Sequence, residues 1–463
     1  MSNEIDADYD QVFLFPPTLE EFIPLNHPAR FIREFVGSLD LASLGFSVRE
    51  SNVGAPNYSS ALLLRAWLYG YYNKVYSTRG LEKLCYNDLG MLWLTGMSYP
   101  DHNTLWRFFR TNQCALKRLF VESVRLATEL GLVGLVLHAL DGTKVEADAS
   151  NSNALHRDYL ERLLKELDKE IDDYFSKVEE QEVLESGLEY ILPDELSDKL
   201  TLRQKIRSGL RKLEESSTSH LSNVDDDARM MKIDERFKFA YNAQTVADAE
   251  KGVIVGSEVI NKGTDNHQLT EMLGQVQENL GEVAEETLAD AGYYSGSELA
   301  KAQEKGYDVL VNLPKEKDQD SDFHKSKFNY DEKTNTYICP KGGTLTFESN
   351  HSSGRGDNYT NQVYRCRDYK DCAHRFACSR DPRGRSVKRS EYDWAVNLQK
   401  EKQRKEDKKN LLLQRRTIVE PVIGIIKNVL GFRRFSYRGL AGVRSQWYLI
   451  CTVINLRKIV KYT

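Results

Sequence analysis

The chain has 463 residues, 40% of them hydrophobic and 29% charged, which predicts two or three domains with a substantial core. Its formal net charge of -5 excludes a uniformly basic nucleic-acid-binding protein but allows charges that are segregated along the sequence. No apolar run approaches the roughly 20 residues of a membrane helix, so we expect no membrane partner. The lack of a basic and apolar leader, together with seven Cys, predicts a cytoplasmic protein with reduced thiols.

Residues 1–131 are predicted to form a helical N-terminal domain. Polar turns at Ser77-Thr78 and at Asp101 each precede an apolar pattern of helical period, so Ser77 or Thr78 and Asp101 are predicted N-caps. Three arginines lie near the starts of these helices: Arg79, Arg107 and Arg110. They favour contact with a DNA backbone, although a plain helical bundle with surface arginines explains them equally well.

Residues 132–313 are predicted to form the first part of a mixed α/β core. An apolar run ends at Asp141 and Gly142, which indicates a buried strand that delivers a carboxylate to its end. A later short apolar strand ends at Asp290 in the same way. Between the two, residues 264–266 are predicted to cap a helix.

A charged helical pair at about 155–222 interrupts this sheet. Leu and Ile recur there at helical spacing among dense Glu and Lys, which indicates an apolar seam on a solvated hairpin. We interpret the segment as an insertion that packs on the core or on another subunit, because its acidic face should avoid DNA.

A second insertion is predicted at 314–400, where the sequence becomes polar and rich in Gly. It carries four cysteines: Cys339, Cys366, Cys372 and Cys378. Four thiolates can hold a tetrahedral structural Zn²⁺, with His374 as an alternative ligand, but the segment lacks a Cys-x2-Cys pair, so unliganded thiols are an equal alternative. Seven nearby cations suggest a DNA-facing surface: Arg365, Arg367, Lys370, Arg375, Arg380, Arg383 and Arg385.

Residues 401–463 resume with helices and are predicted to complete the core. Twelve Lys or Arg but only four acids lie between residues 400 and 438, so positive charge is concentrated there. Aromatic and basic residues alternate in the segment Phe432-Arg433-Arg434-Phe435-Ser436-Tyr437-Arg438. Phosphate contacts and a stacking ring would suit a DNA end that is being opened, whereas burial of the two Phe in the core explains them at least as well.

Glu420 lies in this basic segment after an apolar run. Offsets of minus four and plus seven put Arg416 and Lys427 on the helical face of Glu420. Pro421 disfavours a helical conformation at Glu420, so we expect the helix to be kinked or to begin near residue 419.

Three acids therefore follow apolar stretches: Asp141, Asp290 and Glu420. Phosphodiester chemistry on DNA uses two divalent ions roughly 4 Å apart, which prefer carboxylate ligands. Three acids are a sufficient set for Mg²⁺ or Mn²⁺, although an Asp after a strand is more often a turn residue, and Glu146 and Asp148 are alternatives. Three polar residues could support this site, although a core or turn role is simpler for each: Asn242, Gln244 and His267.

These segments resemble the DDE transposases of bacterial insertion sequences. The resemblance is carried by LDGTKVEA at Asp141, LADAGYYS at Asp290 and RTIVEPVIGIIKNVLGFRRFSYRG at Glu420. It extends over nearly the whole chain through PLNHPARFI, STRGLEKLC, PDHNTLWRF, YNAQTVAD and NKGTDNHQL. The chain is similar to the branch with a Tyr-x2-Arg-x3-Glu-x6-Lys signature, although Leu413 replaces the Tyr, whose role does not carry over.

The resemblance implies an RNase H-like sheet flanked by helices, with Asp141, Asp290 and Glu420 as catalytic metal ligands. It implies Mg²⁺-dependent cleavage of double-stranded DNA at transposon ends, followed by attack of a 3′-hydroxyl on target DNA, in a homodimer or larger complex. The cations expected to hold DNA are Arg416, Lys427, Arg433, Arg434 and Arg438. Two alternatives remain: a two-metal nuclease that cuts without joining, and an inactive DNA-binding regulator derived from a transposase.

Overall fold

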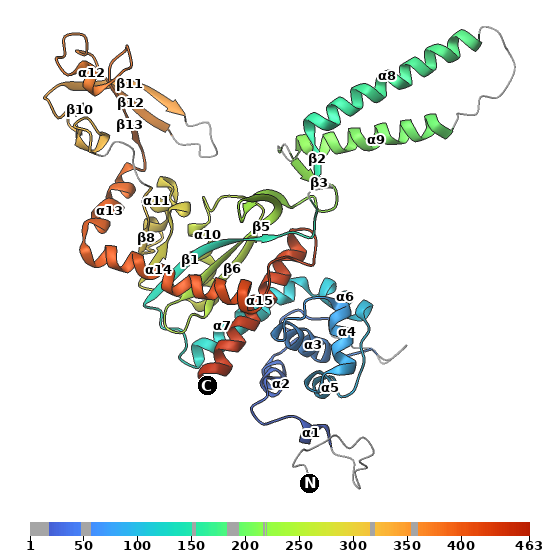
Figure 1. The fold of residues 1–463 in the computed structure, drawn as a ribbon. Helices are drawn as coiled ribbons and strands as arrows, with labels where there is room; N and C mark the ends of the chain where they lie inside the picture. Colours follow the sequence, from blue (N-terminus) through green and yellow to red (C-terminus); the bar gives the residue numbers. More distant parts are fainter. Residues whose placement is uncertain are drawn as a thin grey trace, which may run out of the picture.

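The computed structural model describes residues 18–47, 57–150, 154–182, 194–215, 218, 220–314, 320–352 and 360–463. A mixed sheet lies at the centre of these residues, and a group of N-terminal helices lies beside it (Figure 1). Two arms project from the central part: a pair of long helices and a small antiparallel sheet (Figure 1).

In the described residues the central sheet has six strands: β1 (Leu137–Glu146), β4 (Arg229–Ile233), β5 (Arg236–Asp248), β6 (Ile254–Ile260), β7 (Glu286–Ala289) and β8 (Val309–Val311). β4 and β6 pair with successive parts of β5, and β5 pairs antiparallel with β1. β1, β7 and β8 run parallel to one another. This order confirms the predicted mixed sheet and is consistent with an RNase H-like fold.

Helices cover both the sheet and its crossovers. α10 (Leu269–Leu280) connects β6 to β7, and α11 (Gly296–Glu304) connects β7 to β8. The long C-terminal helix α15 (Leu440–Tyr462) packs between β6 and α7 (Gln113–Glu129). It buries Trp447, Ile450 and Ile454, and each such side chain contributes about 1.5–3 kcal/mol on burial. None of the described helices is long and apolar enough to cross a membrane.

The N-terminal helices are short, and all but the first have a side chain that caps their N-terminus: α1 (Leu19–Phe22), α2 (Pro28–Ser38), α3 (Ser60–Tyr72), α4 (Thr78–Asn87), α5 (Leu89–Thr95) and α6 (His102–Thr111). The Ser77 hydroxyl accepts a hydrogen bond from the Gly80 amide (3.1 Å), and Asp101 accepts one from the Thr104 amide (2.7 Å). Both predicted N-caps are therefore confirmed.

The first insertion forms an arm with its own core. α8 (Arg157–Glu182) and α9 (Asp194–Glu215) stand on a two-stranded base of β2 (Ala154–His156) and β3 (His220–Ser222). Their seam buries Leu160, Leu167, Ile171, Ile206, Leu213 and Leu221. Because this seam closes within the pair, the arm projects away from the central sheet, and the expectation that it packs on the core is wrong (Figure 1).

The second insertion contains more strand than the sequence predicted. β9 (Asn329–Asp331), β10 (Thr336–Ile338), β11 (Thr344–Ser352), β12 (Thr360–Cys366) and β13 (Ser386–Ser390) form an antiparallel sheet, accompanied by η3 (Lys325–Lys327) and α12 (Arg375–Cys378). Its core consists of a few large side chains: Phe323, Phe328, Tyr337, Leu345, Tyr364 and Val387. Aromatic side chains on neighbouring strands pack against each other and take the place of a larger core. The sequence did not predict these strands because they are short and polar, with little alternation of apolar and polar residues.

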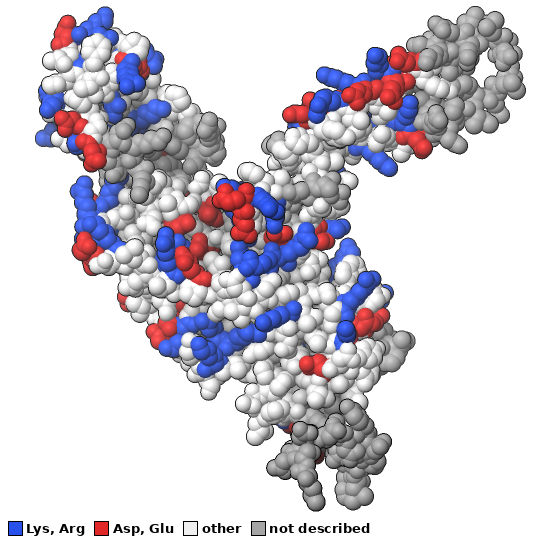
Figure 2. Space-filling model, in the orientation of Figure 1, with Lys and Arg blue, Asp and Glu red and all other residues white. Residues whose placement is uncertain are grey.

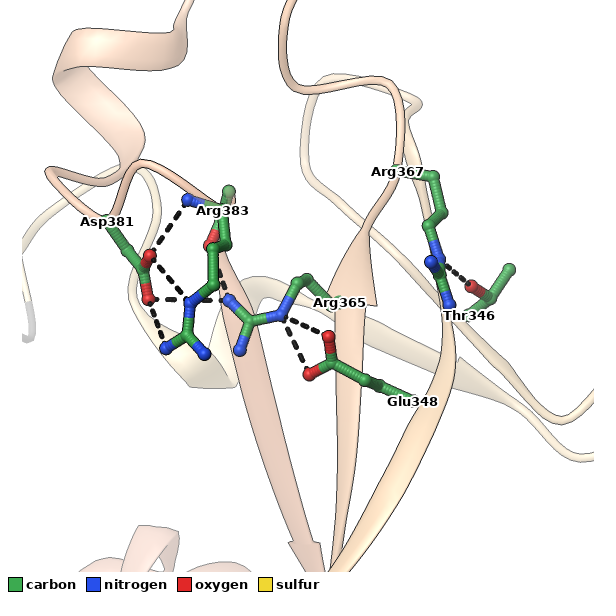
Figure 3. A network of polar contacts seen from close by, with 7 residues as sticks. Thr346, Glu348, Arg365, Arg367, Asp381 and Arg383 are labelled. Carbon is green, nitrogen blue, oxygen red and sulfur yellow. Dashed lines mark hydrogen bonds and ion pairs between the residues drawn. The ribbon is translucent and has the colours of Figure 1, made fainter.

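Arg365 of β12 connects β11 to the loop that precedes β13 (Figure 3). Its Nε lies 2.8 Å from both carboxylate oxygens of Glu348, and its Nη1 lies 3.4 Å from Asp381 Oδ2. Arg383 pairs with the same Asp381, and Arg385 donates to the Phe323 carbonyl oxygen. The prediction that Arg365 faces DNA is therefore wrong, because its side chain is 9% exposed and serves the sheet itself.

The C-terminal helices return the chain to the central sheet. α13 (Asp393–Arg404) contacts β8, and α14 (Glu406–Gly424) crosses β1, β5 and β7. The expectation that a helix begins near residue 419 is wrong, because α14 begins at Glu406 and continues through Pro421 into a π-helical segment, η4 (Ile425–Val429). A kink at Pro421 stays a prediction. Pro421 leaves the Thr417 carbonyl without its helical donor, and Thr417 lies on the exposed side of α14, where water can replace that donor.

Charge is segregated on the surface. Figure 2 shows Lys and Arg gathered over the part of this face where α14 and α15 lie, whereas acids and bases are interleaved along α8. The basic face thus belongs to the C-terminal helices that cover the central sheet, as the sequence predicted.

Candidate active site

Asp141 and Asp290 lie on neighbouring parallel strands. Asp290 directly follows the end of β7, whereas Asp141 lies inside β1, which continues to Glu146, so the prediction that Asp141 lies at a strand end is wrong. Leu140 of β1 lies opposite Ala289 of β7, so the next position on each chain is one of the two aspartates. Paired positions of a parallel ladder direct their side chains to the same face. Accordingly, the negative charge of Asp290 is among the causes that raise the pKa of Asp141.

Arg415 of α14 is the cation at Asp141. Its Nη1 lies 3.0 Å from Asp141 Oδ2, and the two side chains are only 10% and 16% exposed. Burial raises the pKa of Asp141, and the Arg415 charge opposes that shift. The sequence interpretation missed Arg415, although its spacing from Leu412, Val419 and Val422 marks it as a member of the buried face.

Asp290 opens a tight turn after β7. Its Oδ1 accepts a hydrogen bond from the Gly292 amide (2.8 Å), which caps the 3-10 turn η2 (Ala291–Tyr293). Gly142 plays a similar part next to Asp141, since its amide donates to Asp141 Oδ1 (2.9 Å). Each aspartate therefore has one oxygen held by a local backbone amide.

Glu420 lies on α14 but on a different face from Arg415. Its side chain is 55% exposed, and Arg416 Nε lies 3.7 Å from Glu420 Oε1. The predicted sharing of a face by Arg416 and Glu420 is thus confirmed. Glu420 lies five residues after Arg415, which places it roughly 7 Å farther along the axis of α14. Its assignment as a catalytic acid stays a prediction.

Lys427 lies in η4 and faces β1. Its Nζ donates to the Lys144 carbonyl oxygen (3.0 Å). Burial lowers the pKa of Lys427, and the negative charges of Asp234 and Asp141 oppose that shift. Lys427 is therefore bound to β1, the strand that carries Asp141.

Two of the remaining predicted DNA-binding cations, Arg434 and Arg438, form hydrogen bonds with the segment that follows β1. Arg434 Nε donates to the Ala147 carbonyl oxygen (3.1 Å), and Arg438 Nε lies 2.9 Å from Asp148 Oδ2. Arg433 donates to Asn428. Phe432 and Phe435 are each 1% exposed, so the core explanation for these rings is correct and the stacking explanation is wrong.

Glu146 and Asp148, the alternatives to Asp141, are engaged elsewhere. Glu146 pairs with Lys238 of β5, and Asp148 pairs with Arg438. Among the described residues, neither acid forms an ion pair with Arg415. The geometry therefore favours Asp141 as the partner of Asp290.

Asp265 is an acid at this site that the sequence interpretation assigned to a helix cap. α10 begins at Leu269, with Gln268 as its N-cap residue, so the predicted cap at 264–266 is wrong. The Asp265 Oδ1 instead accepts hydrogen bonds from Asn242 Nδ2 and Gln244 Nε2, both at 2.7 Å. Asn242 and Gln244 lie on β5, opposite Lys144 and Gly142 of β1. Their polar, alternating positions on a buried strand were the signal for a nearby partner.

His267 lies on the other side of the same loop. It lines an open polar cleft with Lys262, Lys301 and Glu298. Its Nδ1 lies 3.8 Å from Glu298 Oε1, so the ring is directed toward Glu298 and this cleft.

No group of three or more His, Cys, Asp or Glu in the described residues is gathered closely enough to hold a metal ion. Asp141 and Asp290 nevertheless suit a divalent cation. Their negative charges repel each other, and a cation bound by both would relieve that repulsion. Asp141 already binds one cationic group, the guanidinium of Arg415. The four cysteines line one cavity of the small sheet, together with His374. Amides of Lys341 and Gly343 point at Cys339 Sγ, at 3.4 and 3.2 Å.

The mixed central sheet, with Asp141 inside β1 and Asp290 directly after β7, is consistent with an RNase H-like protein. A family model described as a transposase DDE domain matches residues 338–460, and a transposase domain (DUF772) model matches residues 17–111. Both models describe transposase domains, and together they are consistent with a DDE transposase of the insertion-sequence type. The matched ranges include Glu420 but neither Asp141 nor Asp290. Comparison with curated proteins and with solved structures gave no match.

Proposed function

We propose that this transposase cleaves DNA at transposon ends and joins the resulting 3′-hydroxyl ends to target DNA. The observation that carries the proposal is the register of β1 and β7, in which Asp141 and Asp290 directly follow the paired residues Leu140 and Ala289. Strand cleavage and joining both need stabilisation of charge on a phosphodiester.

Asp141 and Asp290 would hold Mg²⁺ or Mn²⁺, with Glu420 as the third carboxylate from α14. When bound, the ions would activate a nucleophile and stabilise the leaving oxygen of the phosphodiester. Arg415 supports this assignment, because it neutralises Asp141 and attaches α14 to β1. Arg416, exposed beside Glu420, would contact a phosphate of the DNA strand.

The basic face of α14 and α15 would hold the DNA backbone, and a homodimer would bring two ends together. Arg434 and Arg438 would serve less as free phosphate ligands than as residues that order the segment after β1, whereas Arg433, which is bound to Asn428, would contact a phosphate. Lys427 would combine its bond to Lys144 with a phosphate contact. We place the protein in the cytoplasm, where its DNA substrate lies.

A strand-transfer assay tests the proposal. Purified protein is mixed with labelled duplexes that carry the element's own ends, a target plasmid, and Mg²⁺ or Mn²⁺. Wild type should cleave and join, whereas Asp290→Asn and Glu420→Gln should bind ends but leave them uncut. Glu278→Gln, an exposed carboxylate on α10, is the matched control and should cut normally.

The same assay separates the alternatives. Cleavage without joined products would identify a two-metal nuclease. End binding by wild type without cleavage in either metal would identify a DNA-binding regulator. Normal cleavage by Asp290→Asn would show that the acid assignment is wrong.

A further inference from the structure

Asp265 lies between β1, which carries Asp141, and the turn that Asp290 opens. A Cβ added to Gly142 would lie 2.5 Å from Asp265 Oδ1, and a Cβ added to Gly292 would lie 3.0 Å from Asp265 Oδ2. The second of these positions is also 3.0 Å from Asp290 Oδ1. The Asp265 carboxylate thus occupies the space that the glycines beside Asp141 and Asp290 leave open.

A chain of hydrogen bonds connects Asp265 to the Asp290 turn. Gln244 donates to Asp265 through Nε2 and accepts from the Tyr293 hydroxyl through Oε1. Tyr293 closes the turn that Asp290 opens. Burial raises the pKa of Tyr293, and the charges of Asp265, Asp141 and Asp290 add to that shift, so its hydroxyl stays a donor.

The loop that carries Asp265 is held rigidly. The Gln268 amide donates to the Asp265 carbonyl oxygen (3.2 Å), and His267 adopts a left-handed conformation with φ of 67°. Behind them, Glu298 is 1% exposed and accepts from the amide and the hydroxyl of Thr270, at 3.0 and 2.7 Å. A strained residue is retained where the surrounding contacts fix it, and here the fixed position delivers a carboxylate to the candidate active site.

We infer that Asp265 is a positioning residue that sets the separation of Asp141 and Asp290. Its Oδ1 accepts from the side-chain amides of Asn242 and Gln244 on β5, beside β1. Its Oδ2 faces the turn that Asp290 opens, so Asp265 fixes β1 and the end of β7 relative to each other. The inference rests on the proposed divalent-ion chemistry. Removal of such a supporting partner typically costs 10–100-fold in metal affinity or activity.

Substitutions at Asp265 test the inference by Mn²⁺ titration and by end cleavage. Asp265→Ala should weaken Mn²⁺ binding and lower kcat roughly 10–100-fold, with the KM for DNA unchanged. Asp265→Asn should recover most of both, because its amide oxygen can still accept from Asn242 and Gln244. Equal damage from Asn and Ala would instead make the charge of Asp265 essential and overturn the positioning role.

A double-mutant cycle on unfolding supplies a measure that needs no activity. Gly292→Ala should destabilise the wild-type protein, because its new methyl group meets Asp265 and Asp290, but should cost clearly less when Asp265 is also Ala. Additive effects would overturn the contact. A wild type that fails to cleave while this coupling persists would count against the proposed function alone; an Asp265→Ala variant as active as wild type would count against the inference alone.

Discussion

Asp141 of the first core strand forms an ion pair with Arg415 of α14, with 3.0 Å between Oδ2 and Nη1. The two residues are far apart in the sequence, and the charged helical arm and the small sheet lie between them. Their contact fixes the helix that carries Glu420 against the strand that carries Asp141. It also places a cation where the proposed chemistry needs one.

The neighbouring arginines of α14 give a matched comparison. Arg415→Met should destabilise the protein by about 3 kcal/mol, because a half-buried carboxylate beside Asp290 loses its cation. Mn²⁺ should raise the thermal unfolding midpoint of this variant more than that of wild type, since the ion can replace the lost charge. Arg416→Met, 75% exposed, should change stability by less than about 0.5 kcal/mol. Equal thermal shifts for the two variants would contradict this account.

The small sheet should depend on Arg365 independently of the central sheet. Arg365→Met removes the hydrogen bonds to Glu348 and the Asp381 contact, which should cost about 1.5–3 kcal/mol of local stability. Hydrogen exchange should then accelerate in β11, β12 and β13 but not in β1 or β7. Arg367→Met is the control, because Arg367 is exposed and its single contact with Thr346 is 3.4 Å long.

Zinc in the cysteine cavity stays a prediction. If the four thiols that line the cavity bind Zn²⁺, protein purified under reducing conditions should carry one zinc per chain. Removal by a chelator should loosen the small sheet, whose core is too small to be stable without support. Co²⁺ substitution would show from its absorption whether His374 is a ligand. Zinc-free protein in which Cys366→Ser leaves stability unchanged would favour unliganded thiols.

Asp248 should make stability depend on acid pH. It accepts from the amides of Gly134, Leu135 and Glu250, at 3.1, 3.1 and 2.9 Å, and so anchors the segment before β1. Burial raises the pKa of Asp248, but the His138 ring and the backbone amides outweigh that effect, so the pKa is lowered. The charged form therefore stabilises the fold above its unfolded pKa of about 3.9, and this contribution is lost as pH falls through the lower folded pKa.

The measurement compares thermal unfolding of wild type and Asp248→Asn across acid pH. Near pH 7 the variant should be less stable by about 1–3 kcal/mol, and the difference should shrink below about pH 4. Asp308→Asn, on an exposed carboxylate, should show little difference at any pH. A difference that persists unchanged at low pH would mean that the charge of Asp248 contributes nothing.

Local signals in the sequence were strong where one segment decides its own structure. Ser77 and Asp101 cap their helices as predicted, because an N-cap needs only the next three residues. The strands that carry Asp141 and precede Asp290 were visible as apolar runs before an acid, although β1 continues beyond Asp141 to Glu146. Pro421 shows the limit of such rules, since packing of α14 on the sheet overrides its local preference.

The sequence by itself determined the family resemblance, the mixed α/β class and the position of Asp290 directly after a strand. Only the tertiary structure decided which charges meet: Arg415 rather than Arg416 at Asp141, and Asp265 at the strand ends rather than at a helix cap. The physical reason is that apolar periodicity is written along the chain, whereas an ion pair between β1 and α14 depends on sheet register and helix rotation. Neither the register nor the rotation can be read from one segment alone.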